Sequence, residues 1–168
     1  MDFIVENADT YGIDVNSMYV LGESAGGHLA GTLITTDVKQ CFKFRKAMLV
    51  NPITDLFLEE WGNYVSLHNE NKQLFGMTYE QKMQFLSPRY RIDDTVCDVV
   101  LIHGESDTTV SPEHSKRFYS RMQEESKCCE LHLLENTKHA FLMPEYYRYG
   151  WEACQTAIGI IDAVVTDK

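Results

Sequence analysis

The 168-residue sequence predicts an α/β fold, in which helices cover a parallel sheet of about four strands. Helix and strand patterns alternate along the chain, and this alternation is the signature of a parallel sheet. The segment 98–103 is almost wholly apolar, as expected for a strand that is buried on both faces. A hydrophobic content of 44% and a charged content of 24% are typical of a globular protein. We therefore expect residues 1–168 to form a single domain.

The first part of the chain contains two predicted helices and two predicted strands. Residues 2–11 have the pattern of an amphipathic helix that ends near Gly12. An apolar strand follows over 17–21, and after a glycine-rich turn a second helix extends to about Ile34. Residues 46–50 form the second predicted strand, which ends at the turn residues Asn51 and Pro52.

The second part of the chain begins with the apolar strand over 98–103. A helix is expected from Pro112 to about residue 126. Residues 129–135 partly alternate between apolar and polar side chains, which favours a strand at an edge of the sheet. Pro144 is suited to the first position of a closing helix.

Residues 53–97 lie between the second and third strands and lack a strand pattern. About 45 residues are too many for a plain connection, so we predict an inserted helical cap segment. As a group, its aromatic residues lie where a cap over a functional site would be, although each is more often a core residue than a substrate contact. These aromatic residues are Phe57, Trp61, Tyr64, Phe75, Tyr79, Phe85 and Tyr90.

The charge and the cysteines exclude several classes of protein. The formal net charge is −10 with no basic run, which argues against nucleic acid and anionic membranes as partners. Five cysteines, two of them adjacent and none in a CxxC pair, predict neither a disulfide framework nor a cysteine metal site. The first residues do not resemble a signal peptide, and no segment approaches the ~20 apolar residues of a membrane span. We expect a soluble, cytoplasmic protein.

The strongest chemical signal is Gly22-Glu23-Ser24-Ala25-Gly26, a GxSxG motif directly after the strand over 17–21. Here a strand must end and a helix begin within two or three residues, so the serine lies in a strained turn. Glycines at positions 22 and 26 let the two backbones pass closely. The turn exposes the Ser24 hydroxyl and places the Ala25 amide at a helix N-terminus, where it can donate to an oxyanion. Ser24 is therefore the candidate nucleophile.

A nucleophilic serine needs a base, and the base needs an acid that orients it. Asp107 follows the strand over 98–103, and His139 follows the strand over 129–135. The carboxyl ends of parallel strands meet at one edge of the sheet, and the order serine, acid, histidine is one in which such triads occur. We predict that Ser24, Asp107 and His139 converge, with His139 within hydrogen-bond reach of both partners.

Several residues compete for these roles. Glu105 is the rival acid, and Asp107 could instead cap the turn into the next helix. His139 could be a surface histidine of its loop. His103 precedes a glycine at a strand end and is expected to form local hydrogen bonds, and His28 is expected to pack or bond a loop beside the turn. The remaining histidines receive no role: His68, His114 and His132.

These motifs together resemble the α/β-hydrolase superfamily, over nearly the whole chain. The resemblance rests on the Gly22–His28 turn, on the stretch His103–Val110 and on His139-Ala140-Phe141. Ser111-Pro112, Ser115 and, before the third strand, Ser87-Pro88 fit the same pattern. Within the superfamily, the sequence looks most like the esterase and lipase families related to bacterial carbohydrate (acetyl or feruloyl) esterases.

The resemblance implies a serine hydrolase that cleaves carboxylic esters through an acyl-enzyme. Ser24 would attack the ester carbonyl, His139 would take and return the proton, and Asp107 would fix the imidazole. The substrate would be a small-molecule or carbohydrate ester, and no metal or cofactor is implied. Two alternatives stay open: a serine peptidase of the prolyl-oligopeptidase type, and a non-catalytic remnant or interaction module.

One departure from the family pattern concerns the oxyanion hole. Members of these families resemble one another in a further N-terminal half, with a His-Gly-Gly-Gly type motif whose amides complete the hole. This sequence has no such motif and looks like the C-terminal half of a longer enzyme. The strand over 17–21 would then present an open edge, and open edges recruit other strands. We expect the chain to self-associate or to pair with a separate N-terminal chain, and to be a poor esterase alone.

Overall fold

The computed structural model describes residues 1–36, 42–58, 76–143 and 147–166. Within these residues the strands form one four-stranded parallel sheet in the order β1-β2-β3-β4. One row of residues crosses the sheet, from Leu21 through Met48 and Val100 to Glu130. The predicted fold class is confirmed. The strands are β1 (Met18–Glu23), β2 (Phe44–Val50), β3 (Asp98–Gly104) and β4 (Cys129–Leu134).

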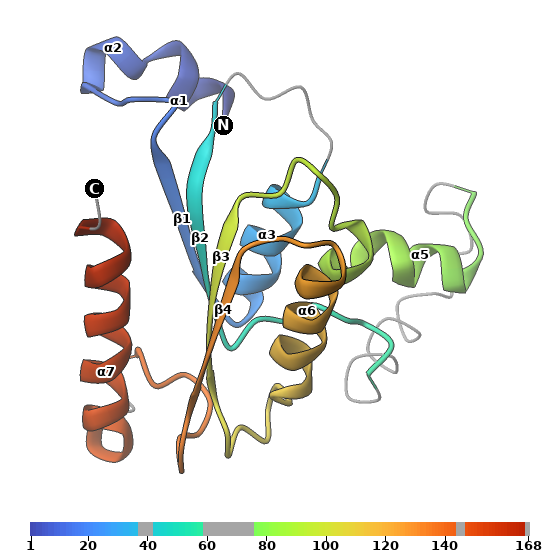
Figure 1. Cartoon of the computed structure of the whole chain (residues 1–168), viewed down its shortest axis with the longest axis vertical. Helices are drawn as coiled ribbons and strands as arrows, with labels where there is room; N and C mark the ends of the chain where they lie inside the picture. The colour runs from blue at the N-terminus through green and yellow to red at the C-terminus, as the bar shows by residue number, and fades with distance from the viewer. Residues whose placement is uncertain (37–41, 59–75, 144–146, 167–168) are drawn as a thin grey trace.

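Helices cover both faces of the sheet (Figure 1). On one face lie α3 (Ala25–Ile34) and α6 (Glu113–Glu124), and on the other lies α7 (Tyr147–Thr166). The helix expected over 2–11 is divided into α1 (Asp2–Glu6) and α2 (Ala8–Tyr11). The break falls at Asn7, whose φ of −110° and ψ of 10° are not helical; its backbone amide at 3.1 Å and its side-chain amide at 2.8 Å both donate to the Phe3 carbonyl. Pro144 lies outside the described residues.

The core consists of two apolar layers separated by the sheet. Ala47, Leu49, Val99 and Leu101 face α3 and α6, whereas Met48, Val50, Val100 and Ile102 face α7. All of these side chains are buried, because successive residues of a strand point to opposite faces and both faces are covered. The expectation that the strand over 98–103 is buried on both faces is confirmed.

The two outer strands differ in how the structure covers them. Within the described residues β1 pairs with β2 alone, and Leu21 is 49% exposed on it. The nearby helices α1 and α2 leave Phe3 64% and Tyr11 62% exposed. At the other side β4 is an edge strand, as expected from its alternating pattern. The chain therefore presents an open, partly apolar strand edge at β1.

The described part of the insertion contains one helix, α5 (Tyr79–Leu86), and a 3₁₀ turn, η1 (Pro88–Arg91), with non-helical segments around them. A capping box of Thr78 and Gln81 begins α5. Its Met83 packs with Val110 in a small buried cluster. The expectation that the insertion's aromatic residues are individually core residues is wrong for the four that the structure describes, because they are exposed: Phe57, Tyr79, Phe85 and Tyr90. Trp61, Tyr64 and Phe75 lie outside the described residues.

Candidate active site

Ser24 lies in the turn between β1 and α3, with a backbone conformation that few residues other than glycine adopt. Its φ is 55° and its ψ is −118°. The Ser24 amide donates to the Val50 carbonyl at 2.8 Å, and its carbonyl accepts from the His28 amide at 3.0 Å, so neighbouring elements hold the strained turn in place. Ala25 is the first residue of α3, where the amide has no acceptor within the helix.

The close approach of the two backbones falls on Gly22. A Cβ atom at Gly22 would collide with the carbonyl oxygen of Gly26, whereas a Cβ at Gly26 would meet no heavy atom within 4 Å. The expectation that both glycines permit this approach is therefore correct for Gly22 and wrong for Gly26. A Cβ atom at Gly27 would lie 3.0 Å from the Cα and Cβ atoms of Pro52, so the backbone is also crowded at this glycine.

This difference predicts opposite effects of two alanine substitutions. Gly22→Ala should destabilise the fold by about 1–3 kcal/mol or more, because the collision is with backbone that cannot move aside. Gly26→Ala should be neutral or stabilising by up to about 1 kcal/mol, because Ala favours a helix over Gly and the site has room. Urea unfolding of both variants measures the effect, and equal destabilisation would contradict the geometry.

His139 contacts both of its predicted partners. Its Nδ1 lies 2.6 Å from Asp107 Oδ2, and its Nε2 lies 2.9 Å from Ser24 Oγ. His139 sits in the loop after β4, and its side chain is 16% exposed, whereas the Asp107 side chain is fully buried. The three residues follow the ends of β1, β3 and β4. They meet at one edge of the sheet because the carboxyl ends of parallel strands lie at the same edge.

The Asp107 carboxylate is saturated with hydrogen bonds. Oδ1 accepts from the amides of Thr109 and Val110, both at 2.9 Å, and Oδ2 accepts from His139. Burial alone would raise the pKa of Asp107. The bonds from His103, His139, Val110 and Thr109 outweigh burial and hold this pKa well below the ordinary value. Asp107 is therefore ionised near neutral pH.

The competing residues lie elsewhere. Glu105 is exposed, which leaves Asp107 as the acid at His139. His28 Nδ1 lies 2.9 Å from the Ile53 carbonyl, the loop-bonding role expected of it. A carbonyl oxygen can only accept, so His28 Nδ1 donates this bond, and burial lowers the pKa of the ring. His103 also bonds locally, as expected.

Three groups around the site make contacts that the sequence patterns do not reveal. His114 accepts from the amides of Thr54 and Asp55, each at 3.2 Å, and so fixes the start of the insertion. Glu23, beside the nucleophile, has one carboxylate oxygen that is buried and lacks a hydrogen-bond partner among the described residues. Burial raises the pKa of Glu23 even though the Leu142 amide donates to it and His139 is near. His103, the third, also contacts Asp107.

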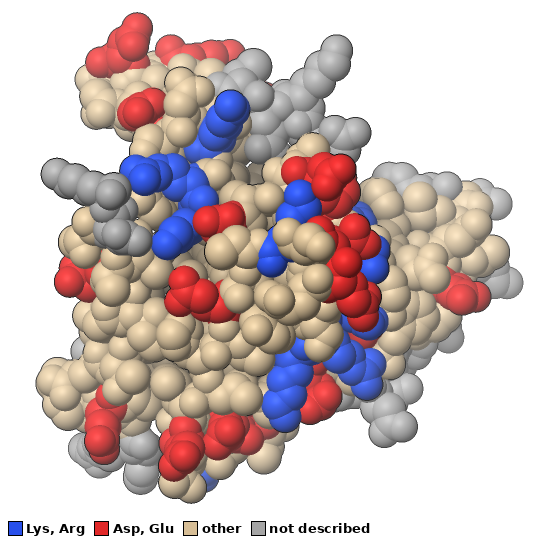
Figure 2. All heavy atoms as spheres, viewed as in Figure 1, with Lys and Arg blue, Asp and Glu red and all other residues tan. Residues whose placement is uncertain are grey.

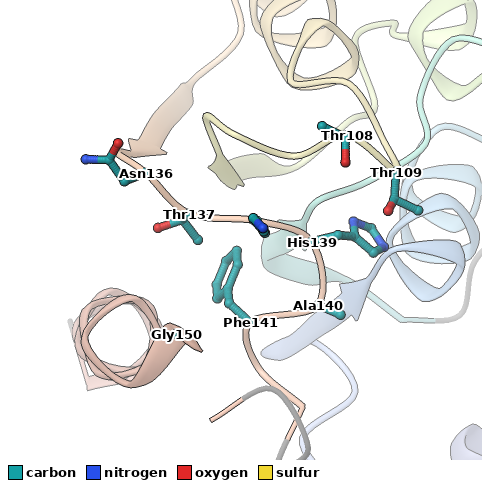
Figure 3. Close-up of a pocket in the computed structure, with 9 residues that line it drawn as sticks. Thr108, Thr109, Asn136, Thr137, His139, Ala140, Phe141 and Gly150 are labelled. Carbon is teal, nitrogen blue, oxygen red and sulfur yellow. The ribbon is translucent and has the colours of Figure 1, made fainter. Parts of the chain in front are cut away.

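A cavity of about 580 Å³ opens beside His139 (Figure 3). Thr108 and Thr109 from the acid loop border it on one side, and Phe141 and Gly150 border it on the other. His139 itself lines this cavity, together with its chain neighbours Lys138 and Ala140.

The described residues show no group of three or more His, Cys, Asp or Glu side chains that could hold a metal ion. Among the described helices, none is both long and apolar enough to cross a membrane. Acidic and basic side chains are intermixed on the face seen in Figure 2.

The parallel sheet and the contact of a strained serine with a histidine–aspartate pair define an α/β-hydrolase fold with a Ser–His–Asp arrangement. A family model described as BD-FAE matches residues 1–122, and the chain belongs to the BD-FAE family.

Curated relatives match most of the chain at low identity. The isoprenylcysteine alpha-carbonyl methylesterase ICME of Arabidopsis thaliana is 26% identical over an alignment of 160 positions, which covers 84% of this chain and 38% of the relative. The kynurenine formamidase of Salmo salar is 26% identical over an alignment of 129 positions, which covers 74% of this chain and 43% of the relative. The chain therefore spans less than half the length of these relatives.

Solved structures share the fold. Esterase 2 of Thermogutta terrifontis superposes with a TM-score of 0.72 at 22% identity, covering 98% of this chain and 60% of that chain. An acetyl ester-xyloside bifunctional hydrolase from Caldicellulosiruptor lactoaceticus gives a TM-score of 0.65 at 21% identity, covering 95% of this chain and 62% of that chain. At these identities the likeness concerns the fold.

Proposed function

We propose that this chain carries the catalytic residues of a serine hydrolase that cleaves carboxylic esters through an acyl-enzyme. The observation that carries the proposal is the position of His139, at 2.9 Å from Ser24 Oγ and 2.6 Å from Asp107 Oδ2. A base must come within about 3 Å of the proton that it removes, and these distances meet that requirement.

Each residue has one task in the reaction. His139 Nε2 accepts the Ser24 proton while Oγ forms a bond to the ester carbonyl carbon. Asp107 accepts from Nδ1–H, which leaves Nε2 as the basic nitrogen, and it stabilises the imidazolium that forms. The Ala25 amide donates to the oxyanion. His139 then protonates the departing alcohol oxygen, and a water activated by the same histidine releases the acid.

The names of the relatives guide the choice of substrate. One relative is a methylesterase, another is a formamidase, and a structural neighbour acts on an acetyl ester and a xyloside. These names favour ester cleavage over the peptidase alternative. We propose esters of small molecules or carbohydrates as the substrates.

Hydrolysis of p-nitrophenyl acetate and labelling by a fluorophosphonate probe test this function together. Labelling needs only an activated serine, whereas turnover also needs a complete oxyanion hole. A missing oxyanion donor lowers kcat by about 10²- to 10³-fold. We expect Ser24 to be labelled and turnover to be slow, because the sequence lacks the His-Gly-Gly-Gly type motif. Absence of both signals would favour the non-catalytic alternative.

The open edge of β1 leads to a proposal about assembly. Unpaired strand edges recruit another strand, and in the isolated chain the available strand is that of a second copy. We expect sedimentation to show self-association that Leu21→Lys weakens, because a lysine on an edge strand disfavours pairing. Leu86→Lys on α5, far from β1 in Figure 1, is the matched control and should leave association unchanged. A wild-type monomer at all concentrations would contradict the proposal.

A further inference from the structure

His103 is a buried histidine with no role in the reaction described above. It lies near the end of β3, four residues before Asp107, and is 0% exposed. Its Nε2 lies 3.0 Å from the Val110 carbonyl oxygen and 3.4 Å from Asp107 Oδ2. Its Nδ1 lies 2.7 Å from Ser115 Oγ. All of its polar atoms therefore have partners.

These partners determine the tautomer of the ring. A carbonyl oxygen can only accept, so His103 Nε2 carries the hydrogen. In the neutral ring Nδ1 then accepts, and the Ser115 hydroxyl donates to it. The Nε2–H group donates to Val110 O, and Asp107 Oδ2 lies 3.4 Å from the same nitrogen, so the carboxylate oxygen that binds His139 also faces a second histidine.

These contacts form a continuous set of hydrogen bonds around Asp107. The Val110 amide donates to Asp107 Oδ1, while the Val110 carbonyl accepts from His103. His103 is held in turn by Ser115 on α6. The acid loop is thereby tied to β3 and α6, and the two oxygens of Asp107 cannot rotate without breaking several bonds. Catalysis depends on such alignment, since a displacement of about 1 Å can cost 100-fold in rate.

We propose that His103, held by Ser115, is a positioning residue for the reaction, which orients the Asp107 carboxylate toward His139 by bonding both Val110 and Asp107. This inference rests on the proposed function, because it assigns a purpose to the alignment of Asp107. His103 would then be a second histidine with a part in the reaction, which orients Asp107 and does not contact the substrate.

Two substitutions of His103 separate the contributions of its two ring nitrogens. A glutamine side-chain amide reaches the place of the histidine Nε2, whereas an asparagine amide reaches only the place of Nδ1. His103→Gln should keep the donor to Val110 and Asp107, and kcat should stay within about threefold of the wild type. His103→Asn should keep only the contact with Ser115, and kcat should fall about 10- to 100-fold with KM unchanged. Equal losses in the two variants, or a change in KM instead of kcat, would overturn the proposal.

Two NMR measurements decide the matter without turnover, and so separate this inference from the proposed function. In the wild-type chain, nitrogen shifts of His103 should report the Nε2–H tautomer, and the Nδ1–H tautomer would overturn the proposal even if neither variant folds. Carbon shifts of the Asp107 carboxyl should show that His103→Asn raises the pKa of Asp107, because a donor to the anion is lost, and that His103→Gln raises it less. If fluorophosphonate fails to label Ser24 while both NMR results hold, the proposed function fails, and the NMR results still show that His103 bonds and orients the Asp107 carboxylate.

Discussion

Ser24→Ala should abolish ester hydrolysis, lowering kcat for p-nitrophenyl acetate by about 10³-fold or more. Without Oγ no acyl-enzyme can form, and only oxyanion stabilisation and binding remain. Fluorophosphonate labelling should disappear as well. The matched control is Ser106→Ala, which removes an exposed serine in the acid loop and should keep full activity.

The members of the triad should also act as one unit. The double variant Ser24→Ala/His139→Ala should be scarcely slower than Ser24→Ala, because the histidine has no proton to remove once the hydroxyl is gone. The measurement is kcat for the two single variants and the double variant under one set of conditions. Losses that multiply would mean that His139 serves a step in which Ser24 takes no part.

Asp107→Asn is the second change with a large expected effect, a loss in kcat of about 10⁴-fold. The asparagine amide can donate to His139 Nδ1, which places the hydrogen on Nε2 and leaves no base facing Ser24. Glu105→Gln removes the same charge two residues away from an exposed side chain and should keep most of the activity. A large loss from Glu105→Gln and a mild loss from Asp107→Asn would reverse the assignment of the acid.

The same substitution has a pH-dependent effect on stability. Because the pKa of Asp107 is lower in the folded protein than in the unfolded chain, ionised Asp107 stabilises the fold at any pH above the unfolded value of about 3.9. That contribution is lost as the pH falls below this value toward the folded pKa. Asp107→Asn should therefore be less stable than wild type near neutral pH, and the gap should narrow in strong acid. Urea midpoints measured across this range provide the test.

Local patterns in the sequence were sufficient to predict the sheet and the meeting of Ser24, Asp107 and His139. A strand buried on both faces is almost wholly apolar, as in β3, and parallel strands bring their carboxyl ends to one edge. What each loop residue bonds depends on contacts between distant segments, which leave no periodic signal. His114 carries no mark in the sequence of its contact with Thr54 and Asp55. The collision at Gly22 and the space at Gly26 likewise follow from how α3 leaves the strand, and both glycines look alike in the motif.

Val110 takes part both in the hydrogen bonds around Asp107 and in the packing of the insertion. Its backbone holds Asp107 and His103, while its side chain packs in a buried cluster with Met83 of α5, Ile53 and Leu56. The acid of the site and the insertion are thus mechanically linked through one valine. A tightly packed interior transmits displacement rather than absorbing it. Changes in the length or sequence of the insertion can for that reason alter turnover from a distance, and evolution could adjust the speed of such an enzyme there without touching any residue that meets the ester.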